Sequence, residues 1–230
     1  MAETKGDASE TASLDALLSR RHSCRGFLPE AVPAATIEAI LAIAQKTPSW
    51  CNAQPWRLVV TTGGATDRFR GALAESIATG EVASDIPFPT EYVGAALARR
   101  RECGFALYAS VGVAKGDRAA AERQANENFR LFGAPHVAIV CTDATLGPYS
   151  LVDCGAYVMS FLLAATSLGV ATVPQAALAL HSDAIRRHFA LDDALQVVCG
   201  IAFGFEDEAH PANSFRTSRA EISEAVRIVR

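Results

Sequence analysis

The sequence predicts a mixed α and β fold, and three observations support this class. Apolar residues recur at helical spacing through most of the 230 residues, while the runs rich in β-branched residues are short and far apart. No internal repeat and no linker divides the chain. Strands this widely spaced do not suit an all-β design, so helices and strands must share one core.

The N-terminal part of the chain contains a tail and two helices. Residues 1–12 are small and polar, which predicts a flexible tail before a single domain over 13–230. Leucines at helical spacing predict a first helix over 14–21. The second helix begins at Pro33, because the first turn of a helix tolerates proline.

Strands and helices then follow one another along the rest of the chain. The helix predicted over 150–169 is apolar on nearly every side, so we expect it to be buried. The predicted elements after residue 56 are a strand over 57–62, helices over 65–80, 91–110 and 117–130, a strand over 135–143, helices over 150–169 and 183–191, a strand over 196–206, and a helix or strand over 221–230.

Composition and charge exclude several classes of partner. A net charge of −4 argues against nucleic acid or an anionic membrane as the main partner. The chain starts without a signal peptide, and its most apolar stretch is shorter than a membrane span, so a cytoplasmic protein is expected. Six cysteines lie scattered without a C-x-x-C pair, which predicts reduced core residues.

Common catalytic signatures are missing from the sequence. It contains no G-x-S-x-G, no P-loop, no H-E-x-x-H and no G-x-G-x-x-G. His181 and His188 lack further ligands at metal spacing, so two histidines on a surface helix are the favoured interpretation and no metal site is predicted. Asp153 is expected to pair with a neighbour or to cap its helix. The basic run over 98–104 suits a solvated helix face, or else an anionic ligand at the mouth of a site.

A first cluster of polar residues follows the first helix. Arg20, Arg21, Ser23 and Arg25 lie within six residues of one another. By helix geometry Arg21 and Arg25 share a face, and guanidinium groups bind phosphate through paired hydrogen bonds. The cluster therefore predicts an anion site, although basic residues at a helix end also satisfy the helix dipole.

Two more clusters complete a candidate pocket. The stretch TPSWCNAQPWRL, residues 47–58, carries amides that suit the edge of a planar heterocycle. An equally good interpretation is a structured turn anchored by Trp56. The third cluster combines VPQAAL at 173–178 with NSFRTSR, which adds Arg216 and Arg219. A phosphate site beside an amide-lined planar site describes a pocket for flavin mononucleotide (FMN) without a Rossmann fold.

These clusters carry a resemblance to a known family. RRHSCRGF, followed by VPAATIEAILAIAQKTPSWCNAQPWRLVV, resembles the start of the FMN-dependent nitroreductase family, with its pattern R-R-x-S-x-R-x-F and then P-S-x-x-N-x-Q-P-W. IPFPTEY, NFRLFGAPHVAIV, LGVATVPQAAL and VVCGIAFGFEDEAHPANSFRTSR resemble later blocks of the family in the same order. The resemblance spans roughly residues 14–220. PSWCN and FRTSR resemble the branch that reduces substituted nitrobenzenes.

The resemblance implies an architecture. The family fold is an α+β sandwich in which a small, mainly antiparallel sheet is flanked by helices and two copies form an intertwined homodimer. The apolar helix over 150–169 fits such an interface. The partners implied are NADPH or NADH, a small aromatic acceptor and a second copy of the chain.

The resemblance also implies roles for individual residues. Arg21 and Ser23 match the phosphate-binding pair, and His22 adds backbone or ring contacts. Arg25 matches the cation beside the N1 and O2 edge of the flavin. Arg219 matches a phosphate arginine, and the role of Arg216 stays open. The remaining matches are Pro48, Ser49, Asn52 and Gln54, which reach the flavin of the partner subunit, and Pro174, Gln175, Ala176 and Ala177, which lie near N5.

The reaction implied is ping-pong transfer at one flavin face. NAD(P)H passes a hydride to N5, and a nitro group then takes up electrons in pairs to become nitroso and then hydroxylamine. Phe88 and Tyr92 are candidates for the substrate pocket, with core packing as the alternative. The competing functions are quinone or activated-alkene reduction on the same fold, a non-catalytic FMN-binding module, and a nucleotide-binding protein without flavin. Ala176 and Ala177 replace an acid and a glycine of one family branch, which leaves the choice of nicotinamide and of substrate open.

Overall fold

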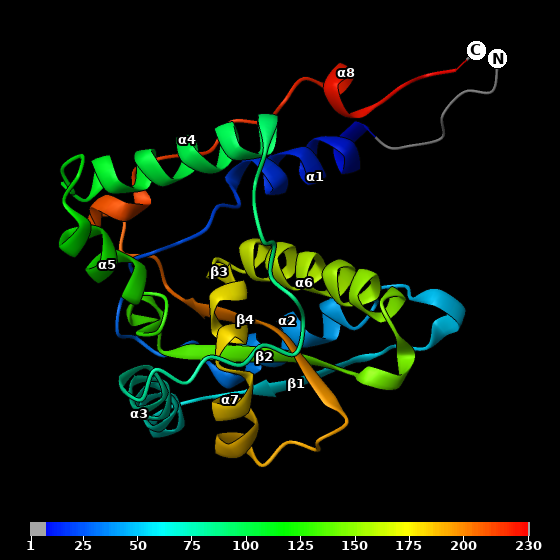
Figure 1. Cartoon of the computed structure of the whole chain (residues 1–230). Coiled ribbons are helices and arrows are strands. Elements are labelled where there is room, and N and C mark those ends of the chain that lie inside the picture. Colours follow the sequence, from blue (N-terminus) through cyan, green and yellow to red (C-terminus); the bar gives the residue numbers. More distant parts are fainter. Residues whose placement is uncertain (1–7, 230) are drawn as a thin grey trace.

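The structure is a computed structural model that describes residues 8–229, and a four-stranded sheet lies at its centre (Figure 1). The strands lie in the order β1 (Trp56–Val60), β2 (His136–Asp143), β4 (Leu195–Gly204) and β3 (Ala171–Gln175). Each neighbouring pair is antiparallel. The small antiparallel sheet expected from the sequence is therefore confirmed.

Helices cover both faces of the sheet (Figure 1). α2 (Ala34–Ala44) and α6 (Tyr149–Ser167) pack on one face, and α3 (Gly64–Ala78) and α7 (Ser182–Phe189) pack on the other. β2 contributes to both layers, because alternate residues of a strand point to opposite faces. This explains why the β2 sequence is apolar almost without interruption, as in strands that are buried on both sides.

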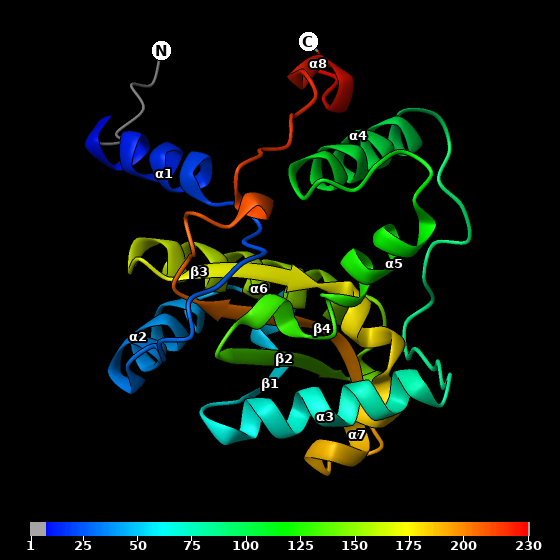
Figure 2. The ribbon, with the colours of Figure 1, turned by 90° about the vertical axis from the view of Figure 1, so that its left-hand side faces the viewer.

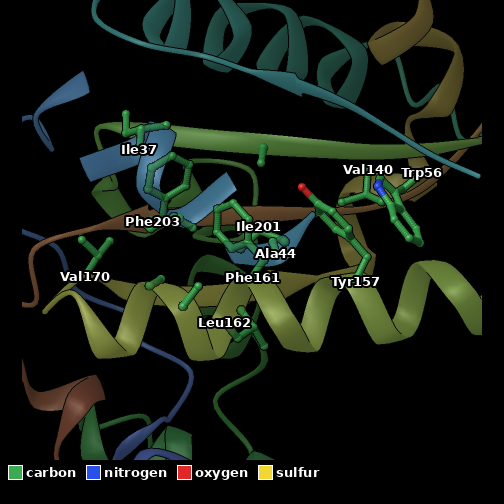
Figure 3. Close-up of a cluster of buried hydrophobic side chains, with 14 of the residues drawn as sticks. Ile37, Ala44, Trp56, Val140, Tyr157, Phe161, Leu162, Val170, Ile201 and Phe203 are labelled. Carbon is green, nitrogen blue, oxygen red and sulfur yellow. The ribbon is translucent and has the colours of Figure 1, made fainter. Parts of the chain in front are cut away.

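The core between the sheet and the α2/α6 layer is built from aromatic and aliphatic side chains (Figure 3). Phe161 and Phe203 meet edge to face with ring centroids 5.6 Å apart, and both are fully buried. Trp56 stacks on Tyr157 with centroids 4.9 Å apart and is also buried. Trp56 thereby fixes the end of the 47–58 stretch to the core.

α6 is only half buried within one chain, which corrects the expectation of a helix buried on every side. Among the described helices it alone is long and apolar enough to cross a membrane. Its inner face carries the buried Cys154, Tyr157 and Phe161. Its outer face leaves Val152 66% exposed. α6 is thus a core helix with one open apolar face.

An outer layer of helices lies above α6 (Figures 1 and 2). It comprises α1 (Ala8–Arg20), α4 (Gly94–Ser110) and the short α8 (Ile222–Ala225), and α5 (Arg118–Asn126) connects α4 to the body of the fold. As far as the structure describes these four helices, none contains a buried residue. Most helices in proteins are stabilised by burying one face, so this layer gains little within one chain.

Several boundaries differ from those the sequence predicts. α1 begins at Ala8, so residues 8–12 are helical instead of belonging to the predicted flexible tail, and residues 1–7 lie outside the described part. α1 also ends at Arg20, the first residue of the arginine cluster, so Arg21, Ser23 and Arg25 lie outside the helix. β3 was not predicted as a strand, because Pro174 interrupts its pattern. The strand lies at the end of the sheet order, where proline is tolerated.

The cysteines and His181 also need correction. All six cysteines are free, as predicted, but two of them lie outside the core: Cys51 is exposed, and Cys103 lies on α4, none of whose described residues is buried. His181 is buried at the start of α7, where its Nδ1 lies 2.9 Å from Ser76 Oγ, so it is no surface residue. His188 is half-buried against the Phe69 and Phe189 rings.

Candidate functional site

The segment after α1 runs alongside β3 as extended chain. Ser23 forms a parallel bridge with Thr172, and the Cys24 amide donates to the Thr172 carbonyl over 3.0 Å. Alternate side chains of extended chain share a side, so Arg21, Ser23 and Arg25 project together while Cys24 is fully buried. The prediction that helix geometry aligns Arg21 with Arg25 is therefore wrong in its reason, because the alignment comes from strand geometry.

A cavity of about 590 Å³ lies above this segment. Its walls are the end of α1, the extended segment, Cys103 of α4, Met159 of α6 and residues 215–219. It brings together six residues predicted as binding residues, namely Arg21, His22, Ser23, Arg25, Arg216 and Arg219. The first and the C-terminal clusters, nearly 200 residues apart in sequence, thus form one site.

The four arginines of the cavity lack acidic partners. Within the described residues, none of them forms an ion pair with a carboxylate. Burial lowers the pKa of Arg21, and the positive charge of Arg219 lowers it further. Burial also lowers the pKa of Arg25. Partly desolvated cations that repel one another are stabilised by an anion, so the cavity suits a phosphate group.

His22 holds the extended segment in place. Its Nε2 lies 2.9 Å from Glu206 Oε1, and its Nδ1 lies 3.2 Å from the Arg20 carbonyl oxygen. Both ring nitrogens therefore have protein partners. His22 anchors the segment to the end of β4 and leaves its backbone and ring face for contact with a ligand.

The segment from Arg21 to Arg25 runs along the outer edge of β3, and the predicted residues 174–177 lie at and just beyond the C-terminal end of that strand. Because the bridge to Ser23 is parallel, Arg25 lies toward Pro174 and Arg21 lies toward the start of β3. Gln175 is buried, and its amide donates to the Asn128 carbonyl over 2.7 Å. Within the described residues its Oε1 is buried without a hydrogen-bond partner, as is the hydroxyl of Thr172. Ala176 is exposed and Ala177 half-buried, directly after the strand.

The 47–58 stretch lies at the N-terminal end of α6, outside the arginine cavity. The Trp50 amide donates to the Asp153 carboxylate over 3.2 Å, which also gives Asp153 the partner that the sequence predicts. The cavity touches α6 at Met159, six positions or about 9 Å further along the helix. Its lining includes none of Ser49, Asn52 and Gln54, so one chain does not bring these residues to the arginines.

The stretch itself is a strained and well-bonded turn. The Ser49 hydroxyl accepts a hydrogen bond from the Gln54 amide over 2.8 Å. Cys51, Asn52 and Gln54 have positive φ angles of 50°, 55° and 46°. Such angles are uncommon outside glycine and cluster at functional sites. The structured turn anchored by Trp56 is confirmed, and the neighbouring Pro48 and Asn52 are exposed.

Phe88 and Tyr92 lie in the segment between α3 and α4. They are 37% and 42% exposed, so the alternative of core packing is wrong, and neither lines the arginine cavity of this chain. Arg100 lies over the Tyr92 ring, 5.1 Å from its centroid. Arg99 pairs with Glu224 over 2.7 Å. The basic run over 98–104 is thus largely a solvated helix face.

Sequence reasoning missed four residues of the site. Cys103 and Met159 come from helices whose patterns gave no functional signal, and only the tertiary fold brings them to the cavity. Phe215 and Asn213 lie in the recognised block NSFRTSR, but neither was singled out. Asn213 is buried and bonded to the backbone at Arg25 and Gly26.

Comparison with known proteins identifies the family. The model of the nitroreductase family matches residues 18–205. The chain belongs to the nitroreductase family. Nitroreductase NfnB of Mycolicibacterium smegmatis is 33% identical over 215 residues, which cover 93% of this chain and 92% of the relative. The 4-nitrobenzoate reductase of Pseudomonas putida is 32% identical over 211 residues, which cover 91% and 92%.

Solved structures of nitroreductases have the same fold. The FMN-dependent nitroreductase NfnB from Mycobacterium smegmatis, solved in complex with NADPH, superimposes with a TM-score of 0.92 at 32% identity. The match covers 96% of this chain and all of that one. The FMN- and NADPH-dependent NfnB of a Sphingopyxis strain (HMH) gives a TM-score of 0.90 at 31% identity, covering 94% and 98%. The family resemblance and the α+β sandwich predicted with it are confirmed.

Proposed function

We propose that this protein is an FMN-dependent nitroreductase that uses NADPH or NADH to reduce nitroaromatic compounds. One observation carries the proposal: a cavity with four arginines and, in the described chain, no paired carboxylate. Family membership supports it, because relatives at 30–32% identity are named as reductases of nitrobenzoate, chloronitrobenzene and nitrobenzene.

The donors of the cavity fit FMN. Arg21, Arg219 and the Ser23 hydroxyl would hold its phosphate, because they combine two cations with a neutral donor. Arg216 lies beside them and adds a third cation. His22 supports the phosphate site through the bonded backbone of its segment.

The ring of FMN fits toward the other end of the β3 edge. Arg25 lies on this side, and Pro174, Gln175, Ala176 and Ala177 follow it along the strand. The buried, unpartnered Gln175 Oε1 is an acceptor of the kind that a flavin N–H requires.

The reaction divides between cofactor and protein. FMN, when bound, would supply the redox chemistry, namely the transfer of two electrons from a nicotinamide to a nitro group. The protein contributes a fixed cation, because the Arg25 guanidinium is partly desolvated and its Nη1 donates only to the Ser23 carbonyl, over 3.2 Å. Positive charge held at this place stabilises the negative charge that a reduced ring carries.

A homodimer completes the site. The cavity of one chain is lined by none of Pro48, Ser49, Asn52 and Gln54. Two-fold symmetry would bring these residues to the cavity of the partner. Exposed apolar side chains on the outer layer and on α6 support this assembly, with Val152, Phe105 and Ile222 exposed by 66%, 60% and 77%. The exposed Phe88 and Tyr92 would line the acceptor pocket in the assembled enzyme.

The remaining proposals concern organisation and location. One FMN-binding domain, predicted over 13–230, is supported by the single sheet that both helical layers share, and its described part extends back to the start of α1 at Ala8. A cytoplasmic location is supported by six free cysteines and by the need for a nicotinamide donor.

Anaerobic absorbance spectroscopy tests the function. The purified protein is expected to show a flavin spectrum that bleaches with NADPH or NADH and recovers when a nitroarene is added, with hydroxylamine as product. A quinone tested in parallel separates a general flavin reductase from a nitroreductase. A colourless protein that does not take up FMN would contradict the cofactor assignment. A bound flavin that neither NADPH nor NADH bleaches would support the competing function of a non-catalytic FMN-binding module.

A further inference from the structure

Asn213 joins the two segments that form the arginine cavity. Its side chain is buried, with 5% of the residue exposed. Its Oδ1 accepts a hydrogen bond from the Arg25 amide over 2.6 Å. Its Nδ2 donates to the Gly26 and Asp207 carbonyls, each over 2.9 Å. These three hydrogen bonds join the backbone at Arg25 and Gly26 to the backbone at Asp207.

The backbone of Asn213 holds a second arginine. Arg216 Nη1 donates to the Asn213 carbonyl over 2.7 Å, and Arg216 lines the same cavity as Arg25. One buried residue thus bonds to two of the four arginines, to the main-chain amide of Arg25 and to the guanidinium of Arg216. Phe215 also meets both arginines, because its carbonyl accepts from Arg216 and its ring lies against the Arg25 guanidinium, but its side chain makes no hydrogen bond to either.

The position of the Arg25 guanidinium is set mainly by the Arg25 main chain, because few contacts hold the side chain itself. In the described chain no carboxylate pairs with its guanidinium, whose Nη1 donates to the Ser23 carbonyl over 3.2 Å. The Phe215 ring lies 5.9 Å from the guanidinium carbon. These contacts are local or weak, so the position of the charge follows the position of the Arg25 main chain. That main chain is bonded to Asn213.

The junction is packed too tightly to adjust. A side-chain carbon at Gly26 would lie 2.2 Å from His210 Cγ, so only glycine allows this approach. The Asp207 amide also donates to the Gly26 carbonyl over 3.0 Å. Because the backbone here cannot relax locally, loss of the Asn213 side chain should shift the main chain of Arg25.

We propose that Asn213 is a positioning residue for the flavin, which holds Arg25 at the place where its charge favours the reduced ring. The inference rests on the proposed function, because it assumes FMN in the arginine cavity. Asn213 itself touches no substrate and lines no wall of the cavity. Its effect should therefore appear in the redox properties of bound FMN as well as in stability.

Asn213→Ala tests the proposal through affinities for oxidised and reduced FMN. We expect affinity for oxidised FMN to fall about tenfold, as when one or two hydrogen bonds are lost. Affinity for reduced FMN should fall a further tenfold, which lowers the midpoint potential by about 30 mV for a two-electron couple. Ser182→Ala is the matched control, because it removes a buried polar group that bonds only to the Ala179 carbonyl, away from the cavity.

The outcomes distinguish a failure of the proposed function from a failure of the role proposed for Asn213. If wild-type protein binds no FMN, the proposed function fails. If Asn213→Ala binds FMN with an unchanged potential, or if Ser182→Ala shifts the potential equally, Asn213 has only a structural role and the inference is overturned.

A measurement on the wild type covers the case in which Asn213→Ala does not fold. Hydrogen exchange of the Arg25 amide reports the Asn213 bond directly, and FMN binding is expected to slow it at least tenfold. The Thr61 amide, bonded to the Val137 carbonyl over 2.9 Å in the sheet, serves as the control and should not change. An Arg25 amide that does not respond to FMN would overturn the inference.

Discussion

Arg21 and Arg219 place two positive charges beside one cavity, and each influences the other. Because Arg219 lowers the pKa of Arg21, the arrangement stores electrostatic repulsion that an anion would relieve. Arg186, by contrast, is paired with Asp85 over 2.9 Å, and this carboxylate raises its pKa. The cavity arginines Arg21 and Arg25 are partly buried without such a partner in the described chain, and their pKa values are lowered instead.

Replacing Arg21 should weaken FMN binding. Arg21→Met removes one charge-assisted hydrogen-bonding group, worth about 1.5–3 kcal/mol, so the dissociation constant should rise about ten- to 150-fold. Arg187→Met is the control, since Arg187 pairs with Glu81 on an exposed surface away from the cavity. Flavin fluorescence titration measures both. Equal affinities for the two variants would remove Arg21 from the binding site.

The cysteines should differ sharply in reactivity. Burial raises the pKa of Cys24, Cys141 and Cys199 to about 12 and that of Cys154 to about 11. A thiol is protonated below its pKa, and only the thiolate reacts, so these four should stay unmodified at pH 8.

Alkylation at pH 8 should therefore modify Cys51 and Cys103 only. Cys51 is exposed, and Cys103 lines the arginine cavity. FMN should protect Cys103, as measured by mass spectrometry of peptides from protein treated with iodoacetamide. Protein unfolded in urea is the control and should react at all six sites. Labelling of Cys103 that FMN leaves unchanged would place the ligand elsewhere.

At the scale of elements, hydrophobic periodicity predicted most helices, but it did not predict that the segment after Arg20 is extended. The helical spacing of Leu14, Leu17 and Leu18 predicted α1 correctly, yet the pattern could not show where the helix ends. Its end at Arg20 is set by the bridge between Ser23 and Thr172, which joins residues about 150 positions apart. Such a contact has no local signature. β3 was missed for a similar reason, since its pairing with β4 stabilises a strand that contains proline.

The α6 core should respond strongly to truncation of Phe161. This side chain is fully buried against Phe203, and Phe→Ala changes in cores cost about 3–5 kcal/mol. Val82→Ala is the control, because Val82 is 66% exposed and its change should stay within about 0.5 kcal/mol. Urea denaturation at fixed protein concentration measures the free energy of unfolding. Similar midpoints for both variants would contradict the assigned core.

At the scale of the whole molecule, the sequence predicted a site that the structure of a single chain does not contain. The amides of the 47–58 stretch and the arginines of the cavity were predicted to meet at one flavin, yet within one chain none of these amides lines the arginine cavity. The family motifs predicted both groups as binding residues. Neither periodicity nor the fold of one chain shows whether a second copy brings the two groups together.

Mixing two inactive variants tests the shared site. Arg21→Met damages the cavity, and the double variant Asn52→Ala with Gln54→Ala damages the stretch proposed to enter the partner. If the two chains exchange at random, half of the dimers are mixed, and each has one intact site. Mixing should then restore about a quarter of wild-type activity.

Val152→Glu is the control for this experiment. A charge on the open face of α6 should prevent assembly, so light scattering should find a monomer and mixing should restore nothing. Activity that does not return when the two assembling variants are mixed would place both clusters in the same subunit.

Because FMN would stabilise the folded protein, the amount of enzyme in a cell should depend on the supply of riboflavin, the vitamin from which FMN is made. A ligand that binds only the folded state at a hundred times its dissociation constant stabilises that state by about 2.7 kcal/mol. Cells short of riboflavin would hold more of the chain as apoprotein, whose repelling cations lower its stability. Proteases remove unfolded chains, so the abundance of the enzyme would fall with its cofactor even at constant synthesis.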